Sequence, residues 1–302
     1  MLLTSHGETI SMKIGILGIN PDGWGTTQLE SSLDKKGISH QFFGFSDLAA
    51  RVGYGSIVEG KRVNCGDLSA LFIRLIGRGS LEEIIFRMDL LHTLSRKGLI
   101  IVNSGRAIER CVDKYYALTL LHESGLPVPR TMVTESIEEA VKGFCELGMD
   151  VVLKPLFGSK GFGSTRISDI GVAERVFSTV RFHRGLLYLQ EFIPHSNSDI
   201  RVFVIGDDVV AAMRRVGESW KTNVSKGAKP VPVKLSEELK DLAIKAAMSV
   251  DCKIAGVDIL ESENGPLIIE LNSQPGWHGL QSVTHVNIAD CITEYILSRV
   301  KK

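Results

Sequence analysis

Apolar residues in the first third of the chain fall into short consecutive runs separated by amphipathic stretches. Such runs are typical of strands buried on both faces of a sheet. They occupy residues 13–19, 38–45, 68–75 and 99–103. The amphipathic stretches predict one helix that ends near Lys36, where Gly37 follows, and another over 81–96. Strands that alternate with helices predict a parallel α/β lobe.

The pattern changes after Ser104, where a helix is expected that ends near Gly125. Pro127 and Pro129 follow, and because two prolines so close together cannot continue a helix, they predict a connector into a second lobe. This lobe should contain strands at 130–134 and 151–154 and helices at 137–147 and 172–182. A region dominated by strands comes next. Its expected elements are strands at 200–205, 209–216, 255–260 and 267–271, and helices at 237–250 and from 287 onward.

These changes divide the chain into four predicted parts. Residues 1–11 are expected to be a disordered extension, because they precede the first strand and lack the pattern of a signal peptide, or else Met12 is the true start. Residues 12–103 form an N-terminal α/β domain. Residues 104–188 form a small α+β unit, and residues 189–302 form a unit built on an antiparallel sheet.

The composition narrows the classes of function. The chain has 302 residues, 44% of them hydrophobic, and its acidic and basic side chains are equal in number. A neutral chain has no overall field that favours nucleic acid or an anionic membrane, and no apolar run is long enough to span a bilayer. The five cysteines are scattered without a CxxC pair, which is typical of reduced thiols. We therefore expect a cytoplasmic protein with no nucleic-acid or membrane partner.

Acidic residues interrupt two apolar runs near the end of the chain, at 256–260 and 267–272. The sequence Glu-Asn-Gly between the runs predicts a hairpin, in which Asp258 faces Glu270. Glu270 and Asn272 share one face of their strand. Facing carboxylates repel unless a hard divalent cation lies between them, and the absence of histidine and cysteine favours magnesium over zinc. The alternative is an exposed hairpin whose carboxylates point to solvent.

A second candidate for chemistry is the glycine-rich stretch after the strand that ends at Lys154. Gly158, Gly161 and Gly163 would let backbone N–H groups approach phosphate closely, with the lysine as a point charge. The stretch is neither a Walker A motif nor a Rossmann fingerprint. A glycine-rich hairpin without any ligand is the alternative.

Two further segments carry polar residues at strand ends. The stretch 188–194 ends a strand with Glu191, Phe192 and Ile193, which could frame a purine between backbone groups and an apolar wall. An ordinary edge strand is the alternative. Charged and amide side chains follow, and such residues are most often simply solvated. They are Asp199, Arg201, Arg214, Arg215, Lys221 and Asn223.

Taken in this order, the segments from about residue 104 to the end resemble the ATP-grasp superfamily, specifically the glutamate ligases of the ribosomal-protein-modification type. The matching stretches are 113–114, 126–129, 154–164, 190–193, 199–201, 256–260 and 270–276. The resemblance implies a three-lobed α/β fold, with a parallel N-terminal lobe, a small lid lobe and an antiparallel C-terminal lobe. ATP would lie between two sheets, under the glycine-rich loop as a mobile lid.

The resemblance also implies a role for each matching residue. Lys114 and Lys154 would contact the phosphates of ATP, under the lid residues Gly158, Ser159, Gly161 and Gly163. Glu191 and the backbone at 192–193 would hold adenine, and Asp199 the ribose. Asp258, Glu270 and Asn272 would bind two magnesium or manganese ions. Arg215 and Arg201 would be catalytic, with Lys221 and Asn223 at the phosphates. Lys221 and Thr222 stand where the bacterial ribosomal-protein enzyme has arginine and serine, which leaves the phosphate geometry there open.

The activity implied is that of an ATP-dependent, ADP-forming ligase that joins L-glutamate to a carboxylate through an acyl phosphate. The segments 86–92, 107–110, 223–228 and 279–284 resemble an archaeal branch that includes the tetrahydromethanopterin:α-L-glutamate ligase. A small-molecule pterin acceptor is therefore expected. Alternatives are a deazaflavin polyglutamate tail, a ribosomal-protein C-terminus, a small-molecule kinase or a nucleotide-binding protein without turnover. The sequence leaves a homo-oligomer open.

Two further features of the sequence bear on a flat acceptor with several carboxylates. Trp277 could offer its indole face to the acceptor, or could pack against the hairpin. Arg201, Arg214 and Arg215 could pair with the acceptor's carboxylates.

Overall fold

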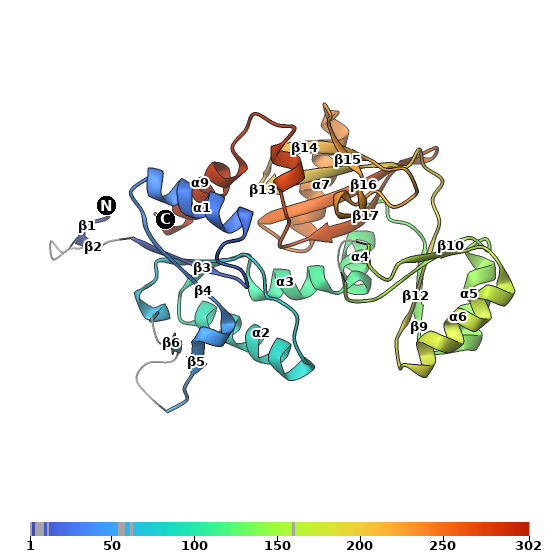
Figure 1. The fold of residues 1–302 in the computed structure, drawn as a ribbon, viewed down its shortest axis with the longest axis horizontal. Helices are drawn as coiled ribbons and strands as arrows, with labels where there is room; N and C mark the ends of the chain where they lie inside the picture. The colour runs from blue at the N-terminus through green and yellow to red at the C-terminus, as the bar shows by residue number, and fades with distance from the viewer. Residues whose placement is uncertain are drawn as a thin grey trace.

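The computed structural model describes residues 2–3, 9–10, 12–53, 58–60, 63–158 and 161–301. Each of its three lobes is built on a sheet of four or five strands. The lobes lie in a row, and the third lobe along the chain sits between the other two (Figure 1). This arrangement agrees with the predicted three-lobed α/β fold. The predicted extension at 1–11 falls mostly outside the described residues, and the two short strands described there pair with each other: β1 (Leu2–Leu3) and β2 (Thr9–Ile10).

The first lobe is built on a parallel sheet in the order β4-β3-β7-β8, as the alternation of strands and helices predicted. Its strands are β3 (Lys13–Leu17), β4 (Ser39–Phe43), β7 (Ala70–Ile73) and β8 (Ile100–Val102). Helix α1 (Trp24–Lys35) packs on one face, and α2 (Leu81–Arg96) packs on the other. Ser80 and Glu83 form a capping box, which explains why α2 begins at the predicted residue. The pair β5 (Leu48–Ala50) and β6 (Val58–Gly60) was not predicted.

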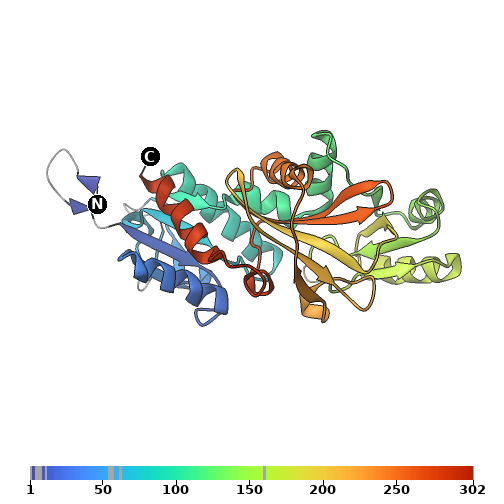
Figure 2. The same cartoon turned by 90° about the horizontal axis from the view of Figure 1, so that it is seen from above.

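The last helix of the chain returns to this first lobe. Helix α9 (Ile288–Val300) lies beside α1 and helps to cover the same face of the sheet (Figure 2). Ser32 Oγ donates to Asp290 Oδ1 at 2.5 Å, and Lys36 Nζ lies 2.9 Å from Glu294 Oε1. The first and last parts of the chain therefore share one core.

The helix predicted after Ser104 is interrupted. Helix α3 (Gly105–Val112) ends at Asp113, whose carboxylate accepts a hydrogen bond from the Tyr116 N–H and so begins α4 (Lys114–Glu123). An aspartate favours an N-cap over a helix interior, which is the physical reason for the break. The break places Lys114 in the first turn of its own helix.

The second lobe carries an antiparallel sheet in the order β11-β10-β12-β9. Its elements are β9 (Thr131–Thr134), α5 (Ile137–Glu146), β10 (Val151–Lys154), β11 (Thr165–Ile167), α6 (Ile170–Phe182) and β12 (Leu187–Glu191). The two helices share a small core with the sheet. Strand β12 crosses the predicted boundary between residues 188 and 189, because it pairs along its length with β9 and β10.

The third lobe carries an antiparallel sheet in the order β15-β14-β13-β16-β17. Its elements are β13 (Ser198–Ile205), β14 (Asp208–Val216), β15 (Lys229–Pro232), α7 (Glu237–Ser249), β16 (Ile254–Ser262), β17 (Gly265–Asn272) and the short α8 (His278–Gln281). Helices α4 and α7 pack on one face of this sheet, and the other face contacts the first lobe. In the part of the chain that the structure describes, no helix is both long and apolar enough to cross a membrane.

Candidate active site

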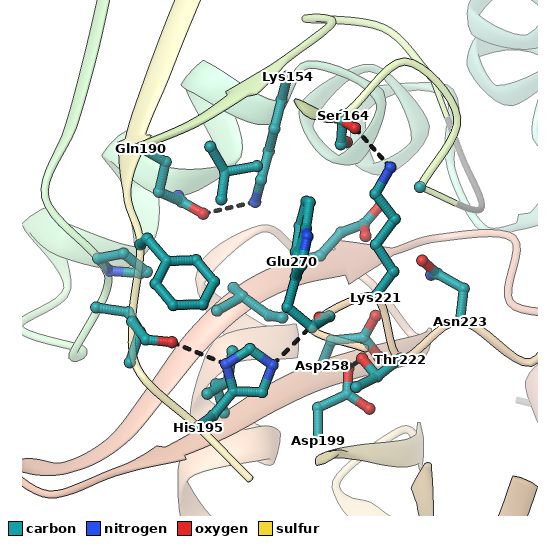
Figure 3. A pocket seen from close by; sticks show the side chains of 18 of the residues that line it. Lys154, Ser164, Gln190, His195, Asp199, Lys221, Thr222, Asn223, Asp258 and Glu270 are labelled. Atoms are coloured by element: carbon teal, nitrogen blue, oxygen red, sulfur yellow. Dashed lines mark hydrogen bonds between the residues drawn. The ribbon is translucent and has the colours of Figure 1, made fainter. Parts of the chain in front are cut away.

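One cleft lies between the sheets of the second and third lobes, and side chains from both lobes point into it (Figure 3). Most residues predicted from the sequence to form a site line this cleft. They are Lys114, Lys154, Gly158, Gly161, Glu191, Phe192, Ile193, Asp199, Arg215, Lys221, Asn223, Asp258 and Glu270. Gly163, Arg201 and Asn272 are not among its lining residues, and Ser159 lies outside the described residues.

The hairpin of β16 and β17 brings two carboxylates to the cleft. Asp258 stands opposite Glu270 in the register, as predicted, and Asp258 is only 1% exposed, which excludes a solvent-facing position for it. The register is reached through a β-bulge: Ile259 pairs with Ile268, which leaves Ile269 as an extra residue. A bulge turns successive side chains to one face, so Ile269 and Glu270 both line the cleft.

A buried row of alternating charges lies beneath these carboxylates. Arg215 donates to both oxygens of Asp199, and its Nη2 also lies 3.0 Å from Asp258 Oδ2. Arg201 donates to both oxygens of Asp258 from the other side. Thr222 Oγ1 donates to Asp199 at 2.7 Å. Because a buried charge is costly unless it is paired, each member of the row depends on its neighbours.

The carboxyl groups of Asp258 and Glu270 differ in pKa. Burial alone would raise both, but Arg201 and Arg215 bring the pKa of Asp258 below its usual value. Glu270 has no ion pair of its own among the described residues. Burial and repulsion from Asp258 raise the pKa of Glu270, and Lys114 offsets this only in part. A cation between the two carboxylates would remove that repulsion.

The donor set fits a hard divalent cation. Asp258 and Glu270 offer oxygen ligands, and no histidine or cysteine among the described residues completes a cluster with them, which favours magnesium or manganese over zinc. Asn272, the predicted third ligand, does not line the cleft, and its Nδ2 is buried without a hydrogen-bond partner. A cation held here would therefore take its other ligands from a bound substrate or from water.

Lysines gather at the same end of the cleft and hold the glycine-rich stretch in place. Lys114 Nζ donates to the carbonyl oxygen of Gly158 at 2.8 Å. Lys221 Nζ donates to the carbonyl oxygen of Ser164 at 2.7 Å (Figure 3). Gly161 has a φ of +66°, and a Cβ there would lie 2.4 Å from Asn223 Oδ1. The positive φ and this close approach to Asn223 both favour glycine at the position.

Lys154 has a different environment from the other two lysines. Its Nζ donates to Gln190 Oε1 at 2.5 Å, and Gln190 Nε2 donates in turn to Thr131 Oγ1. Burial lowers the pKa of Lys154 to about 8, although Glu270 acts in the opposite direction. A lysine held in this way gains interaction energy when an anion reaches it, because its charge is poorly solvated beforehand.

Nucleotide binding is expected to slow amide hydrogen exchange in peptides that cover residues 157–164. Phosphate oxygens would replace the loop carbonyls as partners of Lys114 and Lys221, and would accept hydrogen bonds from the loop N–H groups. One or two charge-assisted hydrogen bonds correspond to a slowing of about tenfold or more. Mass spectrometry with and without ATP and magnesium measures this, with peptides from α2 as the control. Equal exchange in both states would refute the assignment of a lid.

The other end of the cleft is apolar. Phe192 and Trp220 meet edge to face with centroids 6.2 Å apart, and Leu260 and Ile269 line the opposite side. The side chain of Glu191 accepts from the backbone N–H and the Nε of Arg130, at 2.8 and 2.7 Å. Glu191 therefore already has a protein partner, and a planar ring in the cleft would be held mainly by apolar contacts.

The backbone at this end is largely paired as well. The Phe192 N–H donates to the carbonyl of Asp150 at 2.8 Å. The ring nitrogens of His195 lie 2.8 and 3.2 Å from the carbonyl oxygens of Ile193 and Trp220 (Figure 3). Among the described residues, none accepts from the Ile193 N–H, so this group remains for a ligand.

Several lining residues were given no role in the site from the sequence. They include Gln190, His195, Trp220, Thr222, Leu260 and Ile269. Thr222 was named only for its departure from the bacterial enzyme, although its place between Lys221 and Asn223 could have indicated a role for its hydroxyl. Ile269 could not have been found by alternation along β17, because only the bulge brings it to the cleft. His195 follows a proline in a loop and carries no pattern of its own.

The residues weighed for a flat acceptor are mostly engaged within the protein. Trp277 is 2% exposed and packs against Trp24 and Phe203 in the core shared with the first lobe, so its indole offers no open face. Arg214 lies 2.6 Å from Glu261 Oε2, and the other two arginines belong to the buried row. Each of these arginines therefore already has a carboxylate partner within the protein.

Comparison with protein families and known proteins gives one consistent picture. A family model described as a RimK-like ATP-grasp domain matches residues 111–296. The tetrahydromethanopterin:alpha-L-glutamate ligase of Methanocaldococcus jannaschii is 35% identical, over 96% of this chain and 100% of its own length. The enzyme of the same name from Methanosarcina acetivorans is 34% identical, over 94% of this chain and 98% of its own.

Solved structures share the fold at lower sequence identity. The ATP-grasp ligase PsnB, complexed with a minimal precursor, superposes with a TM-score of 0.76 at 22% identity and covers 96% of this chain and 99% of its own. A RimK domain protein from Sphaerobacter thermophilus gives a TM-score of 0.75 at 20% identity and covers 94% of this chain and 99% of its own. These likenesses support the three-lobed arrangement described above.

Proposed function

The chain belongs to the RimK-like ATP-grasp family and is an ATP-dependent ligase, and from this premise we propose that it joins L-glutamate to a terminal carboxylate of a small-molecule acceptor. The product would be an amide formed through the α-amino group of glutamate. Tetrahydromethanopterin is the first candidate for the acceptor, because two relatives that match along nearly their whole length carry that name.

The observation that carries the proposal is the division of the cleft into two chemical halves. One end combines the Asp258 and Glu270 carboxylates with Lys114, Lys154 and Lys221, and the other end is an apolar slot. A nucleoside triphosphate has the same division, with a planar base at one end and a polyphosphate that carries a metal at the other. The cleft therefore supports ATP as the ligand.

The residues that would hold magnesium are Asp258 and Glu270. Two ions is the proposed count, and their remaining ligands would come from the bound substrate or from water. When bound, the metal offsets the negative charge on the transferring phosphoryl group. Lys114, Lys154 and Lys221 would contact the phosphates, with Asn223 and the glycine-rich stretch closing over them.

The chemistry proceeds in two steps. A carboxylate oxygen of the acceptor attacks the γ-phosphorus, the bond to the β-phosphate oxygen breaks, and an acyl phosphate and ADP result. The amine of glutamate then attacks the acyl carbon, and phosphate leaves as the amide forms. Arg215 lines the cleft, and its Nη1 has no partner among the described residues, so it can stabilise the oxyanion. Arg201 lies behind Asp258, where it positions that carboxylate.

A direct test is to incubate the protein with ATP, magnesium, L-glutamate and a panel of acceptors, and to weigh the products. We expect one glutamate residue to be added to the pterin, and ADP and phosphate to form in equal amounts. Addition of glutamate to a deazaflavin tail or to a ribosomal-protein C-terminus, with none on the pterin, would contradict the proposed acceptor but would support the proposed reaction. AMP and pyrophosphate would contradict the proposed attack on the γ-phosphorus.

A small-molecule kinase would use the same cleft without forming an amide. Its signature would be a stable phosphorylated product that accumulates although glutamate is present. A protein that only binds nucleotide would show no ADP above background with any acceptor. Each of these outcomes would overturn the proposed ligation.

A further inference from the structure

Three buried side-chain donors without a partner lie at the end of β17 and in the segment directly after it. Among the described residues, the buried side-chain polar atoms that lack any hydrogen-bond partner are Asn272 Nδ2, Gln274 Nε2 and Trp277 Nε1. All three are N–H groups, which can be satisfied only by an acceptor. A buried donor left unpaired destabilises the folded protein, so three in one short segment point to an acceptor-rich ligand.

Arg74 faces the same segment from the first lobe. It follows the carboxyl end of β7, and its guanidinium lies over the Trp277 ring, 4.8 Å from the centroid. Among the described residues no carboxylate pairs with it, in contrast to Arg201, Arg214 and Arg215. Burial lowers the pKa of Arg74 to about 10. A half-buried guanidinium without a counter-charge is costly to the protein alone and gains most from an anion.

A hollow of about 310 Å³ opens between these groups, and we call it the Arg74 hollow. It is lined by Asn20, Trp24, Gly25, Arg74, Trp277 and His278, among others. A Cβ on Gly25 would lie 3.0 Å from the guanidinium and 3.3 Å from the indole, so the guanidinium rests on the first turn of α1. The N-cap of that helix is Gly23, which has no side chain to accept from the first N–H groups. The guanidinium and the helix start therefore favour negative charge together.

Contacts around Gly256 link a residue behind the cleft to the segment that leads to the hollow. A Cβ at that position would lie 2.7 Å from Arg201 Nη1 and 2.9 Å from Pro275 Cβ. Arg201 holds Asp258, which lines the cleft, and Pro275 sits between Gln274 and the turn that carries Trp277. The lining of the hollow thus begins a few residues after Glu270.

We propose that the Arg74 hollow binds a carboxylate of the amine substrate, one that takes no part in bond formation. This inference rests on the proposed function, in which an amino dicarboxylate attacks the activated acceptor. The carboxylate of the acceptor that reacts has to lie beside the phosphates in the cleft. Both carboxylates of the amine substrate stay intact, and at least one needs a cationic partner away from the transferring phosphoryl group. Arg74 meets that requirement, and Trp277, whose buried N–H is unpaired, lines the same hollow.

Arg74→Met tests the proposal, with Arg96→Met as the matched control, because Arg96 is an exposed arginine at the end of α2. Loss of charge-assisted hydrogen bonds to a carboxylate should raise KM for glutamate about 10- to 100-fold. KM for ATP and for the acceptor, and kcat at saturating glutamate, should stay within about threefold of wild type, a change below 1 kcal/mol. Arg74→Lys should restore part of the affinity, and the melting temperature of Arg74→Met should not fall.

Several results would overturn the proposal. These are an unchanged KM for glutamate in Arg74→Met, a rise in KM confined to the acceptor, or an equal rise in Arg96→Met. A failure of the proposed function would look different, because the wild type itself would add glutamate to no acceptor. Calorimetric titration of L-glutamate, with ADP and magnesium present, then decides: binding that is lost in Arg74→Met supports the hollow, and no binding to the wild type refutes it.

Discussion

Glu270→Gln is expected to remove nearly all ligase turnover and to leave the fold intact. The substitution keeps the shape of the side chain, but it removes one of the two facing carboxylates that would hold magnesium. A metal contributes several kcal/mol to stabilising charge in a phosphoryl transfer, so kcat should fall about a thousandfold, or by ~4 kcal/mol. Product masses and ADP release at saturating substrates measure the loss.

The same substitution should slightly raise the stability of the protein without ligands. Burial and repulsion from Asp258 raise the pKa of Glu270. The contribution of Glu270 to the free energy of unfolding is therefore complete at low pH and is lost as the pH rises through its folded-state pKa. Glutamine has no charge to bury, so the variant should be more stable than the wild type at neutral pH, and this difference should vanish in acid. Glu263→Gln, at the exposed tip of the hairpin, is the control. Near-normal ligation by Glu270→Gln would contradict the assignment of Glu270 as a metal ligand.

Arg215→Met is expected to have the largest effect on folding. The substitution leaves Asp199 and Asp258 with fewer cationic partners, although they are only 2% and 1% exposed. Removal of one partner from a buried ion pair costs about 3–5 kcal/mol of unfolding free energy. Urea denaturation should show this loss at neutral pH. It should shrink in acid, where protonation removes the charge of the unpaired carboxylates.

Arg214 offers a matched control on the same strand. Its side chain points to the other face of β14 and pairs with Glu261, which is largely exposed. Exposed ion pairs contribute about 0–1 kcal/mol, so Arg214→Met should change stability little. If both variants lose the same stability, the buried row does not stabilise the fold more than the exposed ion pair does. A second check is Arg215→Met combined with Asp199→Asn, which should recover part of the loss.

The sequence predicts those features that depend on neighbouring residues. The capping box at Ser80 and Glu83 sets the start of α2, and the period of apolar residues sets most strands. The pairing of Asp258 with Glu270 was also predicted, although from a turn centred on Asn264. In the structure Glu263 and Asn264 form the turn, and the bulge at Ile269 adds back the one residue of offset. The prediction was right because two local details compensate each other.

Features that depend on distant contacts could not be predicted in this way. Nothing near Trp277 in the sequence indicates that Trp24 and Phe203 cover its indole. Likewise, the partners of Arg201 and Arg215 lie on other strands, and only the sheet order brings them together. The sequence identified these arginines as charged residues at strand ends, but it could not tell whether they are free or paired.

The position of α9 has a consequence for synthesis on the ribosome. A chain emerges from its N-terminus, and domains usually fold in that order. Here the face of the first sheet that carries Ile14 and Ile16 is covered in part by Ile292 and Ile296 of α9. The nascent first lobe must therefore wait, with part of its apolar surface uncovered, until the second and third lobes have been made. A chaperone that holds early segments of a nascent chain would find its binding surface on that sheet.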